Sequence, residues 1–233
     1  MKIHSFKVGG LLFIAACCSL QAATVDVLNY GATGWKYLIG TQEASSPTDA
    51  WRVPAFNDAS WSTGTAPIGY PTTPPDSALE GTLSSGTILP NGTVGGYTCV
   101  FLRHPVVINN PASLAQLTLT IRFDDGYVVW FNGVELGRSA NVPPGPPNVG
   151  TLATPEREVT ASEDTFNISG SLLLAGANTL AIQVFNGAAT SSDLFIDARL
   201  VGTVDDVAPT IAALNPPNGA TVPQLNAINV TFS

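Results

Sequence analysis

The sequence has 233 residues, and its 17 acidic and 9 basic side chains give a formal net charge of −8. This balance argues against nucleic acid as a partner, since nucleic acid requires a basic face, and against binding to anionic lipid surfaces. Charged residues make up only 11% of the chain, below the roughly 25% of typical globular chains. Thr, Ser, Asn and Gly therefore supply the polar surface, as is usual in extracellular β-rich domains.

Residues 1–23 have the pattern of a secretion signal. Lys2 and Lys7 form a positive start, residues 8–16 are apolar, and the small residues Ala22 and Ala23 offer a cleavage site. The apolar run is too short to span a bilayer, which takes about 20 residues, and no later stretch is long and apolar enough. Without this signal, 7 basic residues remain against 17 acidic ones, because both of its charged residues are lysines.

The same segment also allows a second interpretation, export as a lipoprotein. Ile14-Ala15-Ala16-Cys17 has the spacing of a bacterial lipoprotein site, and cleavage there would leave Cys17 to carry lipid. Ordinary secretion is favoured, because the first strand is expected near Thr24 and would leave little tether. Either route predicts a secreted, extracellular or cell-surface protein.

The clearest predicted elements are a run of strands and tight turns around residue 124. Residues 116–123 alternate apolar and polar side chains, which predicts a strand with one buried face. Asp124-Asp125-Gly126 then predicts a turn, residues 127–131 a second strand, and Asn132-Gly133 a two-residue hairpin turn. Residues 134–136 return as a third strand.

Further strands are predicted at 24–29, 35–39, 98–108, 179–185 and 194–202. Between them, residues 60–97 and 139–155 are rich in Pro, Gly, Ser and Thr and are expected to be irregular. Many short antiparallel strands without helical periodicity predict an all-β fold, a jelly roll or β-sandwich, over residues 24–202. Cys99 is the single cysteine after the signal, so no intrachain disulfide can form there, and we expect a buried, inert thiol.

The sandwich is expected to end at Gly202. Residues 203–209 read as a linker, and residues 210–233 restart a strand pattern with a turn at 216–219. Two strands alone are marginally stable in water. We therefore expect an incomplete second β domain and a longer parent protein with further domains in the same chain.

The motifs resemble those of galactose-binding-like jelly rolls, which occur as accessory modules of large secreted bacterial proteins. The resemblance covers about residues 24–202. Its first motifs are Gly34-Trp35-Lys36-Tyr37-Leu38, a segment with Trp51, Arg52, Phe56, Asn57, Asp58 and Trp61, and the segment Thr65–Tyr70. Its later motifs are Asp124–Gly126 with Phe131–Glu135, Gly176–Ala181 and Ser191–Leu194. The tail resembles the start of a bacterial Ig-like domain. The strand at 97–105 departs from the family's usual pattern, so its register stays open.

Catalytic arrangements are missing from the sequence pattern. His104 is the single histidine after the signal and lies on a predicted strand, where a structural role is favoured. No zinc spacing or phosphate loop is present, and Lys36 is the single lysine beyond residue 23. A non-catalytic chain is expected.

Asp124 and Asp125 are the candidate metal ligands. Adjacent loop carboxylates suit Ca²⁺, and the segment also resembles the protective-antigen-type lectin domain, which implies calcium at these two residues with Asn132 nearby. The alternative, which is favoured, is that both carboxylates accept backbone N–H groups and only set the turn.

Trp61 and Tyr70 flank the first long loop and are candidates for sugar stacking in a cleft, together with Asn132, although burial in the core is favoured for each tryptophan. The leading hypothesis is a non-catalytic module that binds carbohydrate or another extracellular ligand, with a polysaccharide or cell-surface glycan as the candidate partner. The alternatives are a structural or adhesive spacer, and the N-terminal accessory part of a secreted hydrolase.

Overall fold

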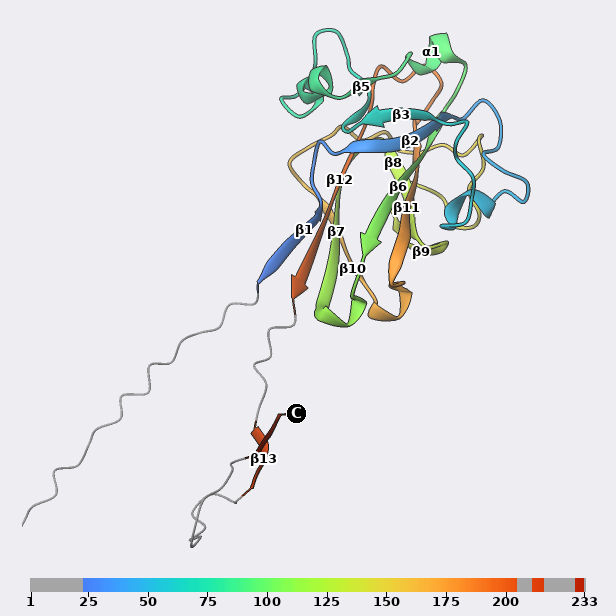
Figure 1. Ribbon diagram of the computed structural model, residues 1–233. Coiled ribbons are helices and arrows are strands. Elements are labelled where there is room, and N and C mark those ends of the chain that lie inside the picture. Colours follow the sequence, from blue (N-terminus) through green and yellow to red (C-terminus); the bar gives the residue numbers. More distant parts are fainter. Residues whose placement is uncertain (1–22, 205–210, 216–228, 233) are drawn as a thin grey trace, which may run out of the picture.

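The computed structural model describes residues 23–204, 211–215 and 229–232, and residues 23–204 form two β-sheets packed face to face (Figure 1). The first sheet has the strand order β10-β7-β12-β4-β5, with β1 also paired to β12. Its strands are β1 (Thr24–Leu28), β4 (Ile68–Tyr70), β5 (Thr87–Ile88), β7 (Leu114–Asp124), β10 (Asp164–Ile168) and β12 (Leu194–Val204).

The second sheet has the order β3-β2-β6-β11-β8-β9. Its strands are β2 (Thr33–Ile39), β3 (Ser62–Thr65), β6 (Cys99–Ile108), β8 (Gly126–Phe131), β9 (Val134–Arg138) and β11 (Gly176–Phe185). All strand pairs of the two sheets are antiparallel except β4 with β5. The helical turns are η1 (Ala50–Arg52), η2 (Glu80–Ser85), α1 (Gly92–Gly95), η3 (Pro111–Ser113) and η4 (Gly170–Leu172). The expected all-β sandwich is confirmed.

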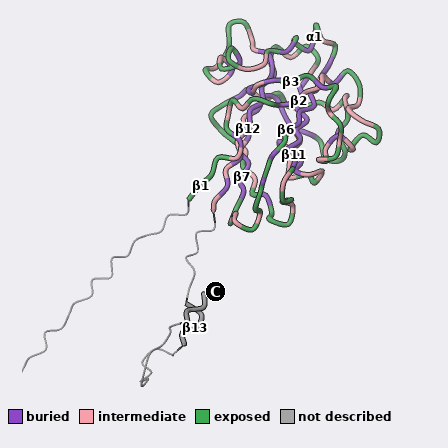
Figure 2. The backbone as a smooth tube through the Cα atoms, in the orientation of Figure 1, coloured by how far each residue is buried: buried purple, intermediate pink, exposed green. Residues whose placement is uncertain are grey.

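The main core lies between the sheets. The alternation predicted for residues 116–123 holds, because Leu117, Leu119, Ile121 and Phe123 are buried there. The facing sheet contributes every second residue of its central strands, and much of the tube of these strands is purple, the colour of buried residues, in Figure 2. These inward residues include Val100, Leu102, Val129, Phe131, Leu180, Ile182 and Val184.

A second apolar cluster lies on the outer face of the second sheet. Phe101 and Trp130 point outward from β6 and β8, and Trp51 packs against both, with ring centroids 5.2 and 5.5 Å apart. The loop segments around residues 51–61 and 142–153 cover this face. Every residue of β8 is buried for this reason, although a strand with one wet face would alternate.

The predicted strands all occur, within a few residues of their expected bounds. The expectation of an irregular stretch at 60–97 is wrong in part, because β3, β4, β5, η2 and α1 lie in it. These strands are two to four residues long, too short to show a periodicity. β3 pairs with β2, β4 pairs with β12, and β5 pairs with β4. β10 was also not predicted.

The tail contributes a separate pair of strands. β13 (Ile211–Asn215) pairs antiparallel with β14 (Asn229–Phe232), close to the two strands expected there. The signal, most of the predicted linker and the turn at 216–219 lie outside the described residues. Among the described residues, no helix has the length and hydrophobicity needed to cross a bilayer.

Candidate functional site

Asp125, one of the two candidate metal ligands, lies in the turn between β7 and β8 and has both carboxylate oxygens occupied. Oδ1 accepts the Arg157 amide at 2.7 Å, and Oδ2 accepts the Gly187 amide at 2.6 Å. The residue is only 3% exposed. Its carboxylate therefore ties two loops to the turn, which is the backbone-accepting role favoured for it above.

Asp124 differs, because only half of its carboxylate is used. Oδ2 accepts the Val159 amide at 2.8 Å, whereas Oδ1 is buried without a hydrogen-bond partner in the described structure. Burial, followed by the charges of Asp193 and Asp125, raises the pKa of Asp124 to about 9. A buried acceptor without a partner is costly, since it has lost its hydration and gained nothing.

Asp193 and Glu158 complete this cluster. Each offers a carboxylate oxygen within 4.8 Å of an oxygen of Asp124 and of the other. Burial and the Glu158 carboxylate raise the pKa of Asp193 to about 7. The cluster lies at the end of the sandwich where β7 finishes and β12 begins, which is also the end that carries η2 and α1 (Figure 1).

A second set of three carboxylates shares Asp193 and adds Asp76 and Glu80. Glu80 is buried and already satisfied, because its oxygens accept the amides of Thr72 and Asp76 and the Thr72 hydroxyl. It therefore holds the loop before η2 in place. Asp76 is exposed, so it borders the cluster on the solvent side.

Trp61 and Tyr70 do not line an exposed cleft, which corrects the expectation that they stack on a sugar. Trp61 is 6% exposed and packs against Trp51 and Phe56 in the outer cluster. Tyr70 is 2% exposed, and its hydroxyl accepts the Asn186 side-chain amide at 2.6 Å. Tyr70 is a residue of β4 in the core between the sheets, and Trp61 belongs to the cluster on the outer face of the second sheet, so both rings are covered.

Asn132 occupies the first position of the predicted hairpin turn. Its φ is 51° and that of Gly133 is 87°, as a two-residue turn of type I′ requires. Its side chain donates to the Leu172 carbonyl and accepts the Thr179 amide, each at 2.8 Å. Its polar atoms are thus engaged within the fold, and it lies far along β8 from the Asp124 turn, so the structure does not bring the two together.

His104 and Cys99 are also held by the fold. The His104 ring lies against Trp35, with centroids 5.0 Å apart, and its Nε2 is 3.0 Å from the Thr33 carbonyl oxygen. Cys99 is fully buried, and burial raises the pKa of its thiol to about 12. The buried thiol and the structural histidine agree with expectation.

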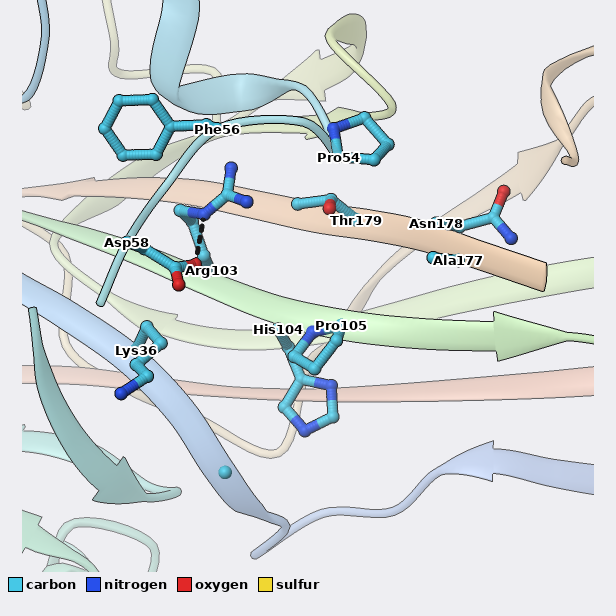
Figure 3. Close-up of a pocket in the computed structure, with 11 residues that line it drawn as sticks. Lys36, Pro54, Phe56, Asp58, Arg103, His104, Pro105, Ala177, Asn178 and Thr179 are labelled. Carbon is cyan, nitrogen blue, oxygen red and sulfur yellow. Dashed lines mark hydrogen bonds and ion pairs between the residues drawn. The ribbon is translucent and has the colours of Figure 1, made fainter.

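A pocket of about 230 Å³ opens on the outer face of the second sheet (Figure 3). Its floor comes from β2, β6 and β11, and one wall comes from the segment after η1. Arg103 stands between them: its Nε donates to Asp58 at 2.7 Å, and its Nη1 donates to the carbonyls of Trp51 and Val53. The lining residues are Gly34, Lys36, Pro54, Phe56, Asp58, Arg103, His104, Pro105, Ala177, Asn178 and Thr179.

The Arg103–Asp58 ion pair links the floor of this pocket to its wall. Arg103 is 4% exposed, and its guanidinium also lies 5.2 Å from the centre of the Phe56 ring. Phe56, Asp58 and Lys36 are half-buried, so each keeps a surface toward the pocket. The pocket therefore combines an aromatic face, a carboxylate and an ammonium group on a fixed base.

Some residues of the pocket and of the carboxylate cluster lie in motifs noted in the sequence, but apart from Asp124 they had no predicted role. Lys36, Phe56 and Asp58 fall in segments that carry the family resemblance, whereas Glu158 and Asp193 had no metal-ligand spacing. Asp124 and Asp193 are brought close by the antiparallel pairing of β7 with β12, where Asp124 faces Phe195. Only such a pairing could have indicated the cluster.

Comparison with family models and with curated proteins finds no match. Among solved structures, the chain is similar to a β-glucuronidase of Bacteroides uniformis, with a TM-score of 0.48, 17% identity, and coverage of 78% of this chain and 18% of that one. It is also similar to a β-glucuronidase of an uncultured Clostridium species, with a TM-score of 0.47, 13% identity, and coverage of 90% and 33%. A Bifidobacterium dentium β-glucuronidase is also similar, with a TM-score of 0.42, 15% identity, and coverage of 82% of this chain and 32% of that one.

The chain thus spans between about a fifth and a third of the length of these structures. The chain is assigned to the two-sheet β-sandwiches from its own strand pairing and not from these similarities. Fold and site together define an all-β sandwich with a polar pocket on the outer face of its second sheet.

Proposed function

We propose that this chain is a non-catalytic, extracellular module of the galactose-binding-like kind that binds a saccharide unit within a larger secreted protein. The observation that carries the proposal is the outer pocket, whose lining includes the half-buried Phe56, Lys36 and Asp58 together with the buried Arg103. Export by the signal at residues 1–23 is part of the proposal, as are the further domains expected in the same chain.

The chemistry of the pocket fits a sugar. Aromatic and proline surfaces pack against the C–H faces of a sugar ring, and Phe56 and Pro54 offer such surfaces. The Asp58 carboxylate can accept from hydroxyl groups, while the Lys36 ammonium can donate to them. A volume of about 230 Å³ lies below the ~300 Å³ at which pockets for drug-sized ligands begin, so the site suits one ring and not a long oligosaccharide.

The same pocket is poorly equipped for hydrolysis. Glycoside cleavage uses two carboxyl groups that flank the scissile bond, and the lining residues include one carboxylate, Asp58, which is paired with Arg103. This supports binding over catalysis at this site.

A glycan array tests the proposal, with neutral and acidic saccharides and with Phe56→Ala and Lys36→Gln beside the wild type. We expect wild-type binding, and a loss of affinity of about 5-fold or more for Phe56→Ala, because a stacked ring is worth ~1 kcal/mol or more. Lys36→Gln should weaken binding of acidic sugars more than of neutral ones.

Arg199→Gln is the matched control for charge, because Arg199 is an exposed residue of β12 paired only with Asp26. Its binding should equal that of the wild type, and all variants should unfold at similar temperatures. A wild type that binds no saccharide, or binding that Phe56→Ala leaves unchanged, would contradict the proposal; the first result would favour the spacer function.

A further inference from the structure

We propose that Asp124, Glu158 and Asp193 form a calcium site that fixes the loops at one end of the sandwich. The site is distinct from the sugar pocket and does not depend on it. Its three carboxylates come from the end of β7, from the loop before β10 and from the residue before β12. Segments far apart in the sequence would be joined through one ion.

The first argument is geometric. Oxygen atoms of the three carboxylates all lie within 4.8 Å of one another. Calcium–oxygen distances are 2.3–2.6 Å, so two ligands on opposite sides of one ion are separated by roughly 4.8 Å. The three groups are therefore already close enough to share a single cation without movement of the backbone.

The second argument is the unsatisfied oxygen of Asp124. This residue is 1% exposed, Oδ2 is used by the Val159 amide, and Oδ1 is buried with no partner among the described residues. In the described part of the chain, none of the ion pairs involves Asp124, Glu158 or Asp193. Three charged carboxylates without a basic partner repel one another, and either a cation between them or bound protons remove that repulsion.

The chemistry of the donors selects the kind of ion. All three ligands are carboxylate oxygens, with no histidine or cysteine in the group, which favours a hard divalent cation over zinc or copper. Ligands on irregular loops suit Ca²⁺, which tolerates six to eight oxygens in flexible geometry, better than Mg²⁺, which requires a regular octahedron. Glu158 is exposed, so an ion can enter from solvent, and water can fill the remaining positions.

The proposed ligand set differs from the pair of residues predicted from the sequence. That prediction paired Asp124 with Asp125, but Asp125 is saturated by the amides of Arg157 and Gly187. These same hydrogen bonds shape the loops that carry Glu158 and Asp193. Asp125 is thus a positioning residue for the proposed site and Asp124 is a ligand.

Calorimetric titration of the full chain, stripped with EDTA and dialysed at pH 7.5, tests this inference with CaCl₂ and MgCl₂ as separate titrants. We expect one Ca²⁺ per chain, weaker Mg²⁺ binding, and a melting temperature raised by roughly 5 °C at a hundredfold excess over Kd. Glu158→Gln and Asp193→Asn should each weaken Ca²⁺ binding by about 10-fold or more, because affinity follows the number of charged ligands.

Glu158→Gln keeps the test valid if Asp193→Asn fails to fold, because Glu158 is exposed and makes no side-chain hydrogen bond to a backbone amide in the described structure. Asp26→Asn, which alters an exposed carboxylate of β1, is the control and should bind Ca²⁺ like the wild type. Absence of Ca²⁺ heat together with an unchanged melting temperature would overturn the proposal, as would wild-type affinity in Glu158→Gln. In that case, protons shared among the carboxyl groups of Asp124, Glu158 and Asp193 would explain their close approach.

Discussion

Asp197 illustrates how burial changes a single residue. Both of its carboxylate oxygens lie 3.2–3.3 Å from the Gly31 amide nitrogen, and Oδ1 also accepts the amide of Ala198. Burial outweighs these contacts and the nearby charge of Arg122, and it raises the pKa of Asp197 to about 6. A carboxyl group with a raised pKa stabilises the folded state when it is protonated.

We predict that this residue makes stability depend on pH between about 4 and 7. Its contribution is complete below the unfolded pKa of about 3.9 and is lost as the pH rises through about 6, because the folded state then has to hold a buried charge. A shift of about 2 units corresponds to at most ~3 kcal/mol. Urea unfolding at several pH values should show a flatter profile for Asp197→Asn than for the wild type. An equal slope in the two proteins would contradict the assignment, and Asp26→Asn should keep the wild-type slope.

The burial of Trp61 and Tyr70 shows how tertiary packing decides which aromatic side chains are accessible. Trp61 and Tyr70 looked like candidates for ligand stacking because they flank a loop rich in Pro and Gly. Tyr70 lies in the core between the sheets and Trp61 in the cluster on the outer sheet face, whereas Phe56 is half-buried and lines the outer pocket. Which of several aromatic residues remains accessible depends on how the loops pack, and local sequence carries little of that information.

At the scale of elements, the hairpin of β8 and β9 is fixed by its turn. Asn132 and Gly133 both have positive φ, and the Asn132 side chain joins the turn to Thr179 of β11 and to Leu172 of η4. It also donates to Asn178 Oδ1 at 2.7 Å. The turn therefore determines the register of the hairpin and its attachment to the neighbouring strand.

We predict that Asn132→Ala lowers the free energy of unfolding by roughly 2–3 kcal/mol, from lost hydrogen bonds and from a strained φ. Asn132→Gly should cost about 1 kcal/mol less, because glycine adopts positive φ freely. Denaturant titration of both variants separates the two effects. Asn110→Ala, at an exposed asparagine of a loop, is the control and should change stability little. Equal losses in both Asn132 variants would show that the conformational cost is negligible.

At the scale of the whole molecule, the sandwich is complete within residues 24–204. β1 pairs with β12 from Thr24 opposite Thr203, so the first and last strands lie side by side (Figure 1). β13 and β14 pair with each other, and neither joins a strand of the sandwich.

We predict that a fragment of residues 24–204 folds alone and melts within about 2 °C of the 24–233 chain, because both sheets and both apolar clusters are retained. A fragment of residues 24–190 should not fold cooperatively, since it lacks β12, which lies between β7 and β4 at the centre of the first sheet. Thermal unfolding followed by circular dichroism measures both. A 24–204 fragment that melts much lower would mean that residues 205–233 stabilise the sandwich.

The sequence by itself determined the all-β class, the inward face of β7, the turn at 132–133 and most of the longer strands. These features depend on local causes: alternation places side chains on one face of a strand, and Asn-Gly adopts the positive φ that a tight hairpin requires. The tertiary structure decided that Trp61 and Tyr70 are buried, that Asp125 is saturated and that Asp124 lies beside Glu158 and Asp193. Those outcomes depend on antiparallel pairing and loop packing between distant segments, and the order of residues along one strand does not encode which distant segment will lie against it.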